Sequence, residues 1–161
     1  MTDKDEFCEL IRAHEKSMYS LAFSIVRNES DAAEVISESI YRAYKNLANL
    51  KAKNSFKPWI LSIVHNTAVE TVRKDCKVVT ANEIIDVAYN SHEEDITIKH
   101  TIRNAVENLK QPYRTVVILF YYEDLSIAKI AQITGSNIVA VKKQLSRARN
   151  LLRQILKEDF K

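Results

Sequence analysis

Glycine, proline and cysteine are scarce in this chain, whose 161 residues include one Gly, two Pro and two Cys. Sandwiches and barrels of many short strands need Gly, Pro or Asn turns every few residues, so this scarcity argues against a turn-rich all-β fold. Glycine-rich phosphate loops and dinucleotide-binding fingerprints need several glycines and are excluded as well. The composition therefore favours helices.

Long apolar runs and ligand clusters are also missing. No run approaches the roughly 18 apolar residues of a membrane span, and the charged start of the chain does not resemble a signal peptide. Two cysteines make no disulfide framework, and no Cys/His spacing suggests zinc. We expect cytoplasmic residence with reduced thiols, no membrane insertion, no metal and no cofactor. Because no nucleophile and base are paired, we also expect no enzymatic activity.

The charge is small in total but unevenly distributed. The net charge is +3, yet residues 78–95 carry five acidic side chains and no Lys or Arg, and residues 96–161 carry twelve Lys or Arg against five acidic residues. Residues 1–77 are nearly balanced. A basic block of this kind favours a polyanionic partner such as nucleic acid.

Apolar residues recur at three- and four-residue spacing over both ends of the chain, which predicts helices. We expect one helix over about 7–25, a second from Asp31 to about Leu47 with Ser30 or Asp31 as its N-cap, and a third from Pro58 to about Lys74. Residues 48–57 read as a basic loop. Since residues 75–95 lose this period, we predict an all-α protein of two small domains, 1–77 and 96–161, joined by an acidic linker, 78–95.

The only glycine marks a helix-turn-helix in the second domain. Ser126 can cap a short helix, Ala131 is small enough for a close helix crossing, and Gly135 accepts the positive φ of the turn. Ser136 or Asn137 can cap the helix that follows.

The second helix of this motif divides into two faces. Ile138, Val141 and Leu145 are expected to face inward. Polar and basic residues remain outside, namely Lys142, Lys143, Ser146, Arg147, Asn150 and Arg153. An outward basic face on the second helix suits the major groove of DNA, and the alternative is a solvated face without a ligand.

Two segments then resemble one family, the extracytoplasmic-function (ECF) sigma factors. Residues 96–157 are similar to the region-four domain of that family, and residues 1–77 are similar to its region-two domain. The matching residues in the second domain are Leu125-Ser126, Ile130-Ala131, Val141-Lys142 and Leu145-Ser146-Arg147-Ala148-Arg149. Those in the first are Asp31-Ala32, Glu34-Val35-Ile36-Ser37-Glu38, Arg42-Ala43-Tyr44, Trp59-Ile60-Leu61, Asn66, Ala68, Glu70 and Arg73.

This resemblance implies a promoter-specificity subunit with three sets of contact residues. The set for core RNA polymerase is Asp31, Glu34, Ser37, Glu38 and Arg42. The set for the −10 element, bound as a single strand, is Lys51, Lys53, Asn54, Phe56, Lys57 and Asn66. The set for the −35 element, bound as a duplex, is Ser136, Asn137, Ala140, Lys142, Lys143, Ser146 and Arg147.

Chemistry within the −10 set is suited to single-stranded DNA. The lysines can follow phosphates and the asparagines can hydrogen-bond base edges, whereas Phe56 either stacks on a base or packs in the core. The resemblance also implies an anti-sigma partner. The alternative function is a stand-alone helix-turn-helix regulator, which would normally dimerise on paired half-sites.

Overall fold

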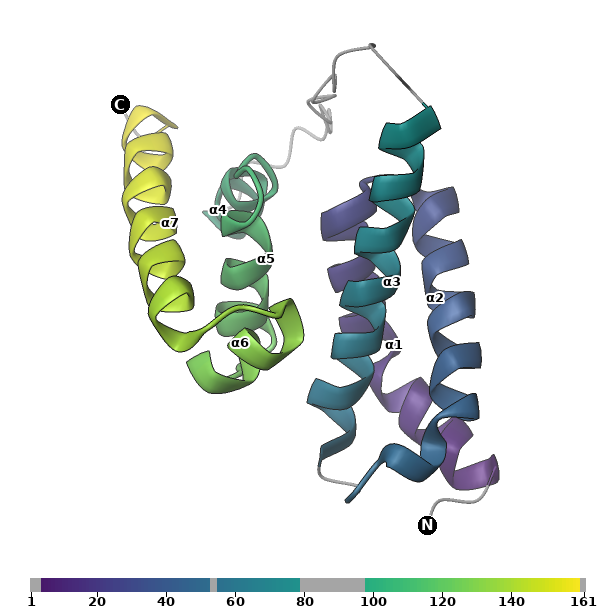
Figure 1. Cartoon of the computed structure of the whole chain (residues 1–161). Coiled ribbons are helices and arrows are strands. Elements are labelled where there is room, and N and C mark those ends of the chain that lie inside the picture. The colour runs from purple at the N-terminus through teal and green to yellow at the C-terminus, as the bar shows by residue number, and fades with distance from the viewer. Residues whose placement is uncertain (1–3, 53–54, 79–97, 160–161) are drawn as a thin grey trace.

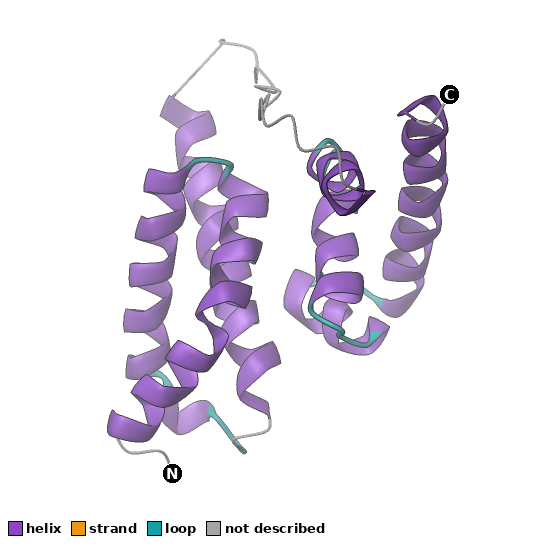
Figure 2. Cartoon of the chain, turned by 180° about the vertical axis from the view of Figure 1, so that it is seen from behind, coloured by secondary structure: helices purple, strands orange, loops and turns teal. Residues whose placement is uncertain are grey.

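The structure is a computed structural model that describes residues 4–52, 55–78 and 98–159. Every regular element in these ranges is helical, as Figure 2 shows from behind. The elements are α1 (Lys4–Val26), α2 (Glu29–Lys45), the 3-10 turn η1 (Leu47–Asn49), α3 (Phe56–Val78), α4 (Ile98–Glu107), α5 (Tyr113–Val117), the π-helical turn η3 (Ile118–Tyr122), α6 (Ile127–Thr134) and α7 (Ile138–Asp159). The all-α prediction is confirmed.

The amino-terminal half is a bundle in which α1, α2 and α3 each pack against the other two (Figure 1). The apolar residues that set the helical period face the middle of the bundle. The buried ones are Phe7, Ile11, Met18, Leu21, Ala22, Ala32, Val35, Ala43, Phe56, Ile60, Leu61, Val64 and Ala68. Burial of this continuous apolar stripe stabilises the bundle far more than helix propensity does.

The start of α2 differs from the prediction. Its cap is Asn28, whose Oδ1 accepts a hydrogen bond from the backbone N–H of Asp31 at 2.8 Å. The predicted caps, Ser30 and Asp31, already lie inside the helix. A cap must have extended backbone and stand just before the first helical residue, and Asn28 has φ −146°.

Other helix ends are shifted by a few residues. α2 ends at Lys45, because Asn46 leaves the helical backbone conformation, with φ −106° and ψ 19°, and its side-chain Nδ2 donates to the carbonyl of Arg42 at 2.8 Å. α3 begins at Phe56, inside the segment predicted as a loop, and continues to Val78. Pro58 fits this first turn, where its missing N–H has no intrahelical partner to lose.

The carboxy-terminal half consists of α4 to α7, with a helix-turn-helix made by α6 and α7. The prediction of two small helical domains, the second with this motif, is confirmed. Its boundaries after residues 77 and 95 stay predictions, because residues 79–97, which include nearly all of the predicted acidic linker, lie outside the described residues.

The two halves pack together through α3 against α6 and α1 against α5. Val116, Leu119, Ile130 and Ile133 of the carboxy-terminal half belong to the same buried apolar cluster as the core of the bundle. A smaller cluster holds α4, α5 and α7 together through Val106, Leu109, Val117, Ile118 and Ala148. In the part of the chain that the structure describes, the two halves therefore share one apolar core, and a smaller core lies within the carboxy-terminal half.

Candidate nucleic-acid interface

The turn between α6 and α7 has the geometry that the sequence predicts. Ser126 caps α6, and its Oγ accepts from the backbone N–H of Lys129 at 3.2 Å. Gly135 ends α6 in the left-handed conformation, with φ 69°, and the N–H groups of Gly135 and Ser136 both donate to the carbonyl of Ala131. This left-handed cap closes the end of α6 and redirects the chain into α7.

Asn137 is the cap of α7. Its Oδ1 accepts from the backbone N–H of Ala140 at 2.8 Å, so of the two predicted caps Asn137 is confirmed and Ser136 is not. The cap fixes the direction of α7 and therefore the direction of its basic face.

The faces of α7 are sharply divided. Val141 and Leu145 are buried as predicted. The prediction that Ile138 faces inward is wrong, because its side chain is 47% exposed. Helical side chains lean toward the amino end of their helix. Ile138 is the first residue of α7, so its side chain extends beyond the end of the core that Val141, one turn later, packs into.

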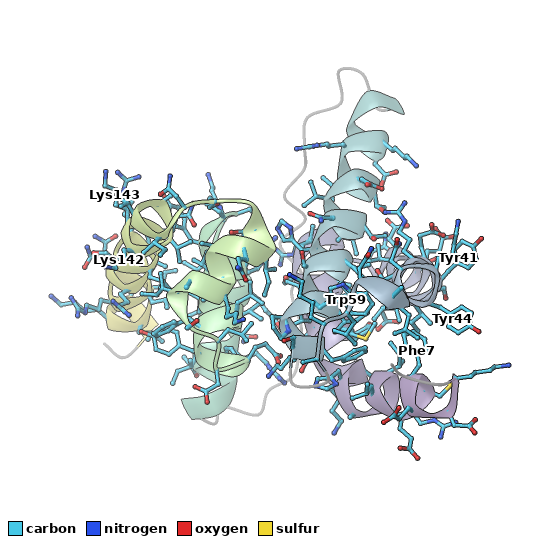
Figure 3. All side chains as sticks on the ribbon, turned by 60° about the horizontal axis from the view of Figure 1, so that its bottom comes forward. Phe7, Tyr41, Tyr44, Trp59, Lys142 and Lys143 are labelled. Carbon is cyan, nitrogen blue, oxygen red and sulfur yellow. The ribbon has the colours of Figure 1, made fainter. Side chains whose placement is uncertain are left out.

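Exposed polar and basic residues cover the outer face of α7. Figure 3 shows Lys142 and Lys143 projecting from the side of α7 that faces away from α3. Of the predicted −35 set, Ala140 is half-buried and the others are exposed, namely Ser136, Asn137, Lys142, Lys143, Ser146 and Arg147. All of the predicted −35 set except Ala140 is therefore accessible to a ligand.

Arg149 lies outside this set and packs against the aromatic residues of η3. Its Nε donates to the hydroxyl of Tyr121 at 2.7 Å, and its guanidinium lies 5.8 Å from the ring centres of Phe120 and Tyr121. It joins α7 to η3 and helps to hold the second helix of the motif in place.

The predicted −10 set is divided between several environments. Lys51 and Asn66 are exposed. Lys53 and Asn54 lie outside the described residues. Lys57 is half-buried, and its ammonium contacts Glu123 of the carboxy-terminal half.

Phe56 is a core residue in this structure. It is fully buried, and its ring centre lies 6.4 Å from that of Phe7, 5.4 Å from that of His14 and 5.8 Å from that of Trp59. Of the two alternatives that the sequence leaves open for Phe56, base stacking or core packing, the structure has core packing, with the ring fully buried. Phe56 is the first residue of α3, and its large apolar ring anchors the first turn of this helix in the core of the bundle.

The predicted polymerase set lies along one side of α2. Glu34, Ser37 and Glu38 are exposed, whereas Asp31 and Arg42 are half-buried. These residues, except Asp31, line a groove of about 680 Å³ between α2 and α3.

Arg42 joins the two walls of this groove. Its Nε contacts Glu38 Oε1 and its Nη1 contacts Glu70 Oε2, both at 3.0 Å, and Nη1 also donates to Thr67 Oγ1 at 3.3 Å. Burial disfavours its charge, but the hydrogen bonds to Glu70 and Glu38 outweigh that effect and raise the pKa of Arg42. Arg42 therefore orders two carboxylates on this surface.

The described ranges contain neither a metal site nor a membrane span. Among these residues, no three His, Cys, Asp or Glu side chains come together where they could hold a metal ion. In the same part of the chain, no helix has the length and apolar character needed to cross a membrane.

Comparison with known proteins identifies the family. The model for Sigma-70 region 2 matches residues 10–77, and that for Sigma-70 region 4 matches residues 99–152. RNA polymerase sigma factor SigV of Bacillus subtilis (strain 168) is 33% identical over 160 residues, which cover 99% of this chain and 96% of that protein. The chain belongs to the ECF sigma factors.

Further relatives agree with this assignment. ECF RNA polymerase sigma factor SigW of the same organism is 26% identical over 97% of this chain and 91% of that protein. The fold matches sigma factor RpoE from Bartonella quintana, solved with the anti-sigma factor NepR, with a TM-score of 0.79, 22% identity and coverage of 96% and 98% of the two chains. It also matches CnrH, solved with the cytosolic domain of CnrY, with a TM-score of 0.68, 19% identity and coverage of 98% and 91%.

The function follows from the family. This sigma factor is a promoter-recognising subunit of RNA polymerase. Sigma factors in general are not enzymes.

The residues that join the two halves were not predictable from the sequence motifs. Gln111 Nε2 and Arg114 Nε both donate to the carbonyl of Ser24, at 3.0 and 2.6 Å, and Glu123 meets Lys57. Arg114 and Glu123 are charged yet almost fully buried. The sequence does offer one indication of their burial, because Arg114 and Glu123 flank an apolar run, residues 116–120. A charged side chain that is buried beside such a run needs a hydrogen-bonding or charged partner.

Proposed function

We propose that this sigma factor reads the −35 element with the outer face of α7. The observation that carries this is the exposed basic surface on the second helix of a well-formed helix-turn-helix. Lys142, Lys143 and Arg147 can pair with guanine edges or phosphates, and Ser136, Asn137 and Ser146 can donate to the backbone. Ala140 sits between them and leaves room for a close approach to the bases.

The −10 element is bound by the amino end of α3 and the segment before it. Lys51, Lys53 and Lys57 neutralise phosphates of the single strand, and Asn54 and Asn66 contact base edges. Phe56 supports this surface from the core rather than by stacking, because its ring is fully buried.

Core RNA polymerase binds along α2. Glu34, Ser37 and Glu38 present an exposed acidic and polar face, and Arg42 holds Glu38 in position through a 3.0 Å ion pair. Asp31 extends this face toward the start of the helix. Fixed side chains of this kind lose less conformational freedom on binding than mobile ones.

An anti-sigma protein is the second partner that we propose. The structural relative RpoE was solved in complex with the anti-sigma factor NepR. In this chain a groove of about 880 Å³ lies between the two halves, with Tyr19, Phe23, Ile36 and Ile118 among its lining residues. Its apolar walls fit a helix of such an inhibitor. We further propose a cytoplasmic location and no catalytic activity of the chain itself.

Reconstitution with bacterial core RNA polymerase tests this function. We expect the purified chain to co-elute with core enzyme at near-equal stoichiometry, and Glu34→Lys to weaken co-elution because it reverses the charge of an exposed contact. Glu9→Lys, an equal change on the exposed face of α1, is the matched control. No association at low salt would overturn the proposal, and a shift of palindromic duplex DNA without polymerase would favour the stand-alone regulator instead.

A further inference from the structure

One ion pair links the proposed −10 surface to the other half of the molecule. Lys57 Nζ donates to the backbone carbonyl of Glu123 at 2.8 Å and lies 3.3 Å from Glu123 Oε2. The side chain of Lys57 is 33% exposed and that of Glu123 is 9% exposed. The ammonium is therefore engaged twice at a partly dry interface, where charge pairing is stronger than in water.

A second contact reinforces the same arrangement. The carbonyl of Ser24 is in the last turn of α1, where carbonyls have no partner within the helix. Gln111 and Arg114 of the carboxy-terminal half both donate to it, and Arg114 also donates to the carbonyl of Leu109 at 2.8 Å. The positive guanidinium is favourable at the negative end of the helix dipole. One half thus caps a helix of the other.

The position of Glu123 has a consequence for DNA. Its carboxylate and backbone carbonyl take up the Lys57 ammonium that a phosphate of the single strand would otherwise pair with, and the carboxylate adds negative charge beside the proposed −10 surface. The −35 face of α7 is unaffected, since Lys142 and Lys143 project away from α3 (Figure 3). The arrangement engages Lys57 of the proposed −10 surface and leaves the proposed −35 face open.

We propose that this is a closed, self-inhibited form of the chain, in which the Lys57–Glu123 ion pair acts as a latch that must open before the −10 strand binds. The inference rests on the proposed role of Lys57 in −10 binding. Because α3 and α6 also pack through apolar side chains, removal of the pair shifts the balance toward the open form rather than separating the halves outright.

The test compares charge variants of the full chain by small-angle scattering and by binding of a short fluorescent oligo(dT) strand. Oligo(dT) suits a phosphate contact because such binding is largely independent of sequence. Glu123→Gln removes the ion pair, and Glu123→Lys places two ammonium groups together. Asp124→Asn is the matched control. Asp124 is the next residue and is exposed, so this variant removes one negative charge without touching the ion pair, and Asn tolerates the φ of 58° at this position.

We expect a graded response. Glu123→Gln should raise the affinity for oligo(dT) about three- to tenfold and increase the radius of gyration, which is about 15 Å for a compact chain of this length. Glu123→Lys should have a larger effect on both, and Asp124→Asn should change the radius of gyration little. The exchange Lys57→Glu with Glu123→Lys should restore the compact form, whereas Lys57→Glu alone should open it and weaken DNA binding.

Two results would overturn the proposal. If both Glu123 variants keep the wild-type radius of gyration, the pair is not a latch. If they open the chain but bind oligo(dT) no better than Asp124→Asn, the latch does not mask a DNA contact. Neither readout needs polymerase, so failure of the sigma function in co-elution remains a separate outcome.

Discussion

The two proposed DNA-binding surfaces differ in how far the protein itself uses their residues. In the carboxy-terminal half, Lys142, Lys143 and Arg147 stand on an exposed helix face. In the amino-terminal half, Phe56 fills the core and Lys57 pairs with Glu123. The first set is exposed, whereas two members of the second, Phe56 and Lys57, take part in the packing of the chain.

This contrast indicates which substitutions separate binding from stability. An exposed lysine in high dielectric contributes little to folding, so its removal is felt mainly by a ligand. A buried ring or a half-buried ion pair contributes to both. Substitutions on the two surfaces should therefore differ in kind as well as in size, and the most damaging one lies in the core.

Replacement of Phe56 by Ala should lower the free energy of unfolding by about 3–5 kcal/mol, because it leaves a cavity in a fully buried site. Urea denaturation measures this. Phe56→Leu, which keeps most of the side-chain volume, should lower the free energy of unfolding less. Lys51→Ala, at an exposed residue of the predicted −10 set, should lower it by under about 0.5 kcal/mol. A decrease below about 1 kcal/mol for Phe56→Ala would contradict the core assignment.

The double variant Lys142→Ala with Lys143→Ala should behave in the opposite way. We expect stability to change by under about 0.5 kcal/mol. The slope of log affinity against log salt for duplex DNA should become shallower by about two, because each of the two lysines neutralises one phosphate in the wild-type complex.

The matched control for this pair is Lys110→Ala with Lys157→Ala, which removes two exposed charges from the same half. Titration of a labelled duplex at several salt concentrations measures the slope. Equal slopes for the two double variants would show that Lys142 and Lys143 do not contact DNA.

Gly135→Ala should cost about 1–2 kcal/mol of stability, since a residue with Cβ is strained at φ 69°. An added Cβ would meet no atom within 4 Å, so the cost is purely conformational. Gly135→Asn should cost less, because Asn tolerates the left-handed region better. Thermal or urea unfolding distinguishes them, and equal destabilisation by the two variants would mean that the backbone conformation is not the cause.

A smaller effect is expected from pH through His65. This residue lines a cavity of about 390 Å³ between α3 and the carboxy-terminal half, together with Arg73 and Gln144. Within the described residues, His65 Nδ1 and Gln144 Oε1 are buried without a hydrogen-bond partner. Burial lowers the pKa of His65 below its usual 6.5, against an opposing hydrogen bond to Asn66.

The direction of the pH effect is set by proton binding. The folded chain binds the His65 proton less readily than the unfolded chain, so stability is full above about pH 6.5 and falls as the pH drops through the lowered pKa. We expect the urea midpoint of the wild type to fall more between about pH 7.5 and pH 5.5 than that of His65→Gln, which cannot titrate there. If the urea midpoints of the wild type and of His65→Gln fall equally with pH, His65 is not the cause of the pH dependence.

Local features were predictable because they depend on neighbours in the chain. The cap at Ser126 and the turn at Gly135 follow from short-range hydrogen bonding and backbone sterics. The buried stripe with Val141 and Leu145 follows from helical period. The same reasoning misplaced the cap of α2 by two or three residues, because Asn28, Ser30 and Asp31 all have side chains that can cap a helix and only the position where the helix starts decides among them.

Helical period, caps and charge are local properties, so the amino-acid sequence alone was enough to specify an all-α chain, a helix-turn-helix at its only glycine and the basic face of α7. Three other features depend on tertiary packing: Phe56 is buried among Phe7, His14 and Trp59 of the amino-terminal bundle, Arg114 caps α1, and Glu123 holds Lys57. Arg114 and Ser24 are 90 positions apart in the chain, and Lys57 and Glu123 are 66 positions apart. No local sequence pattern specifies which surfaces of the two halves pack together.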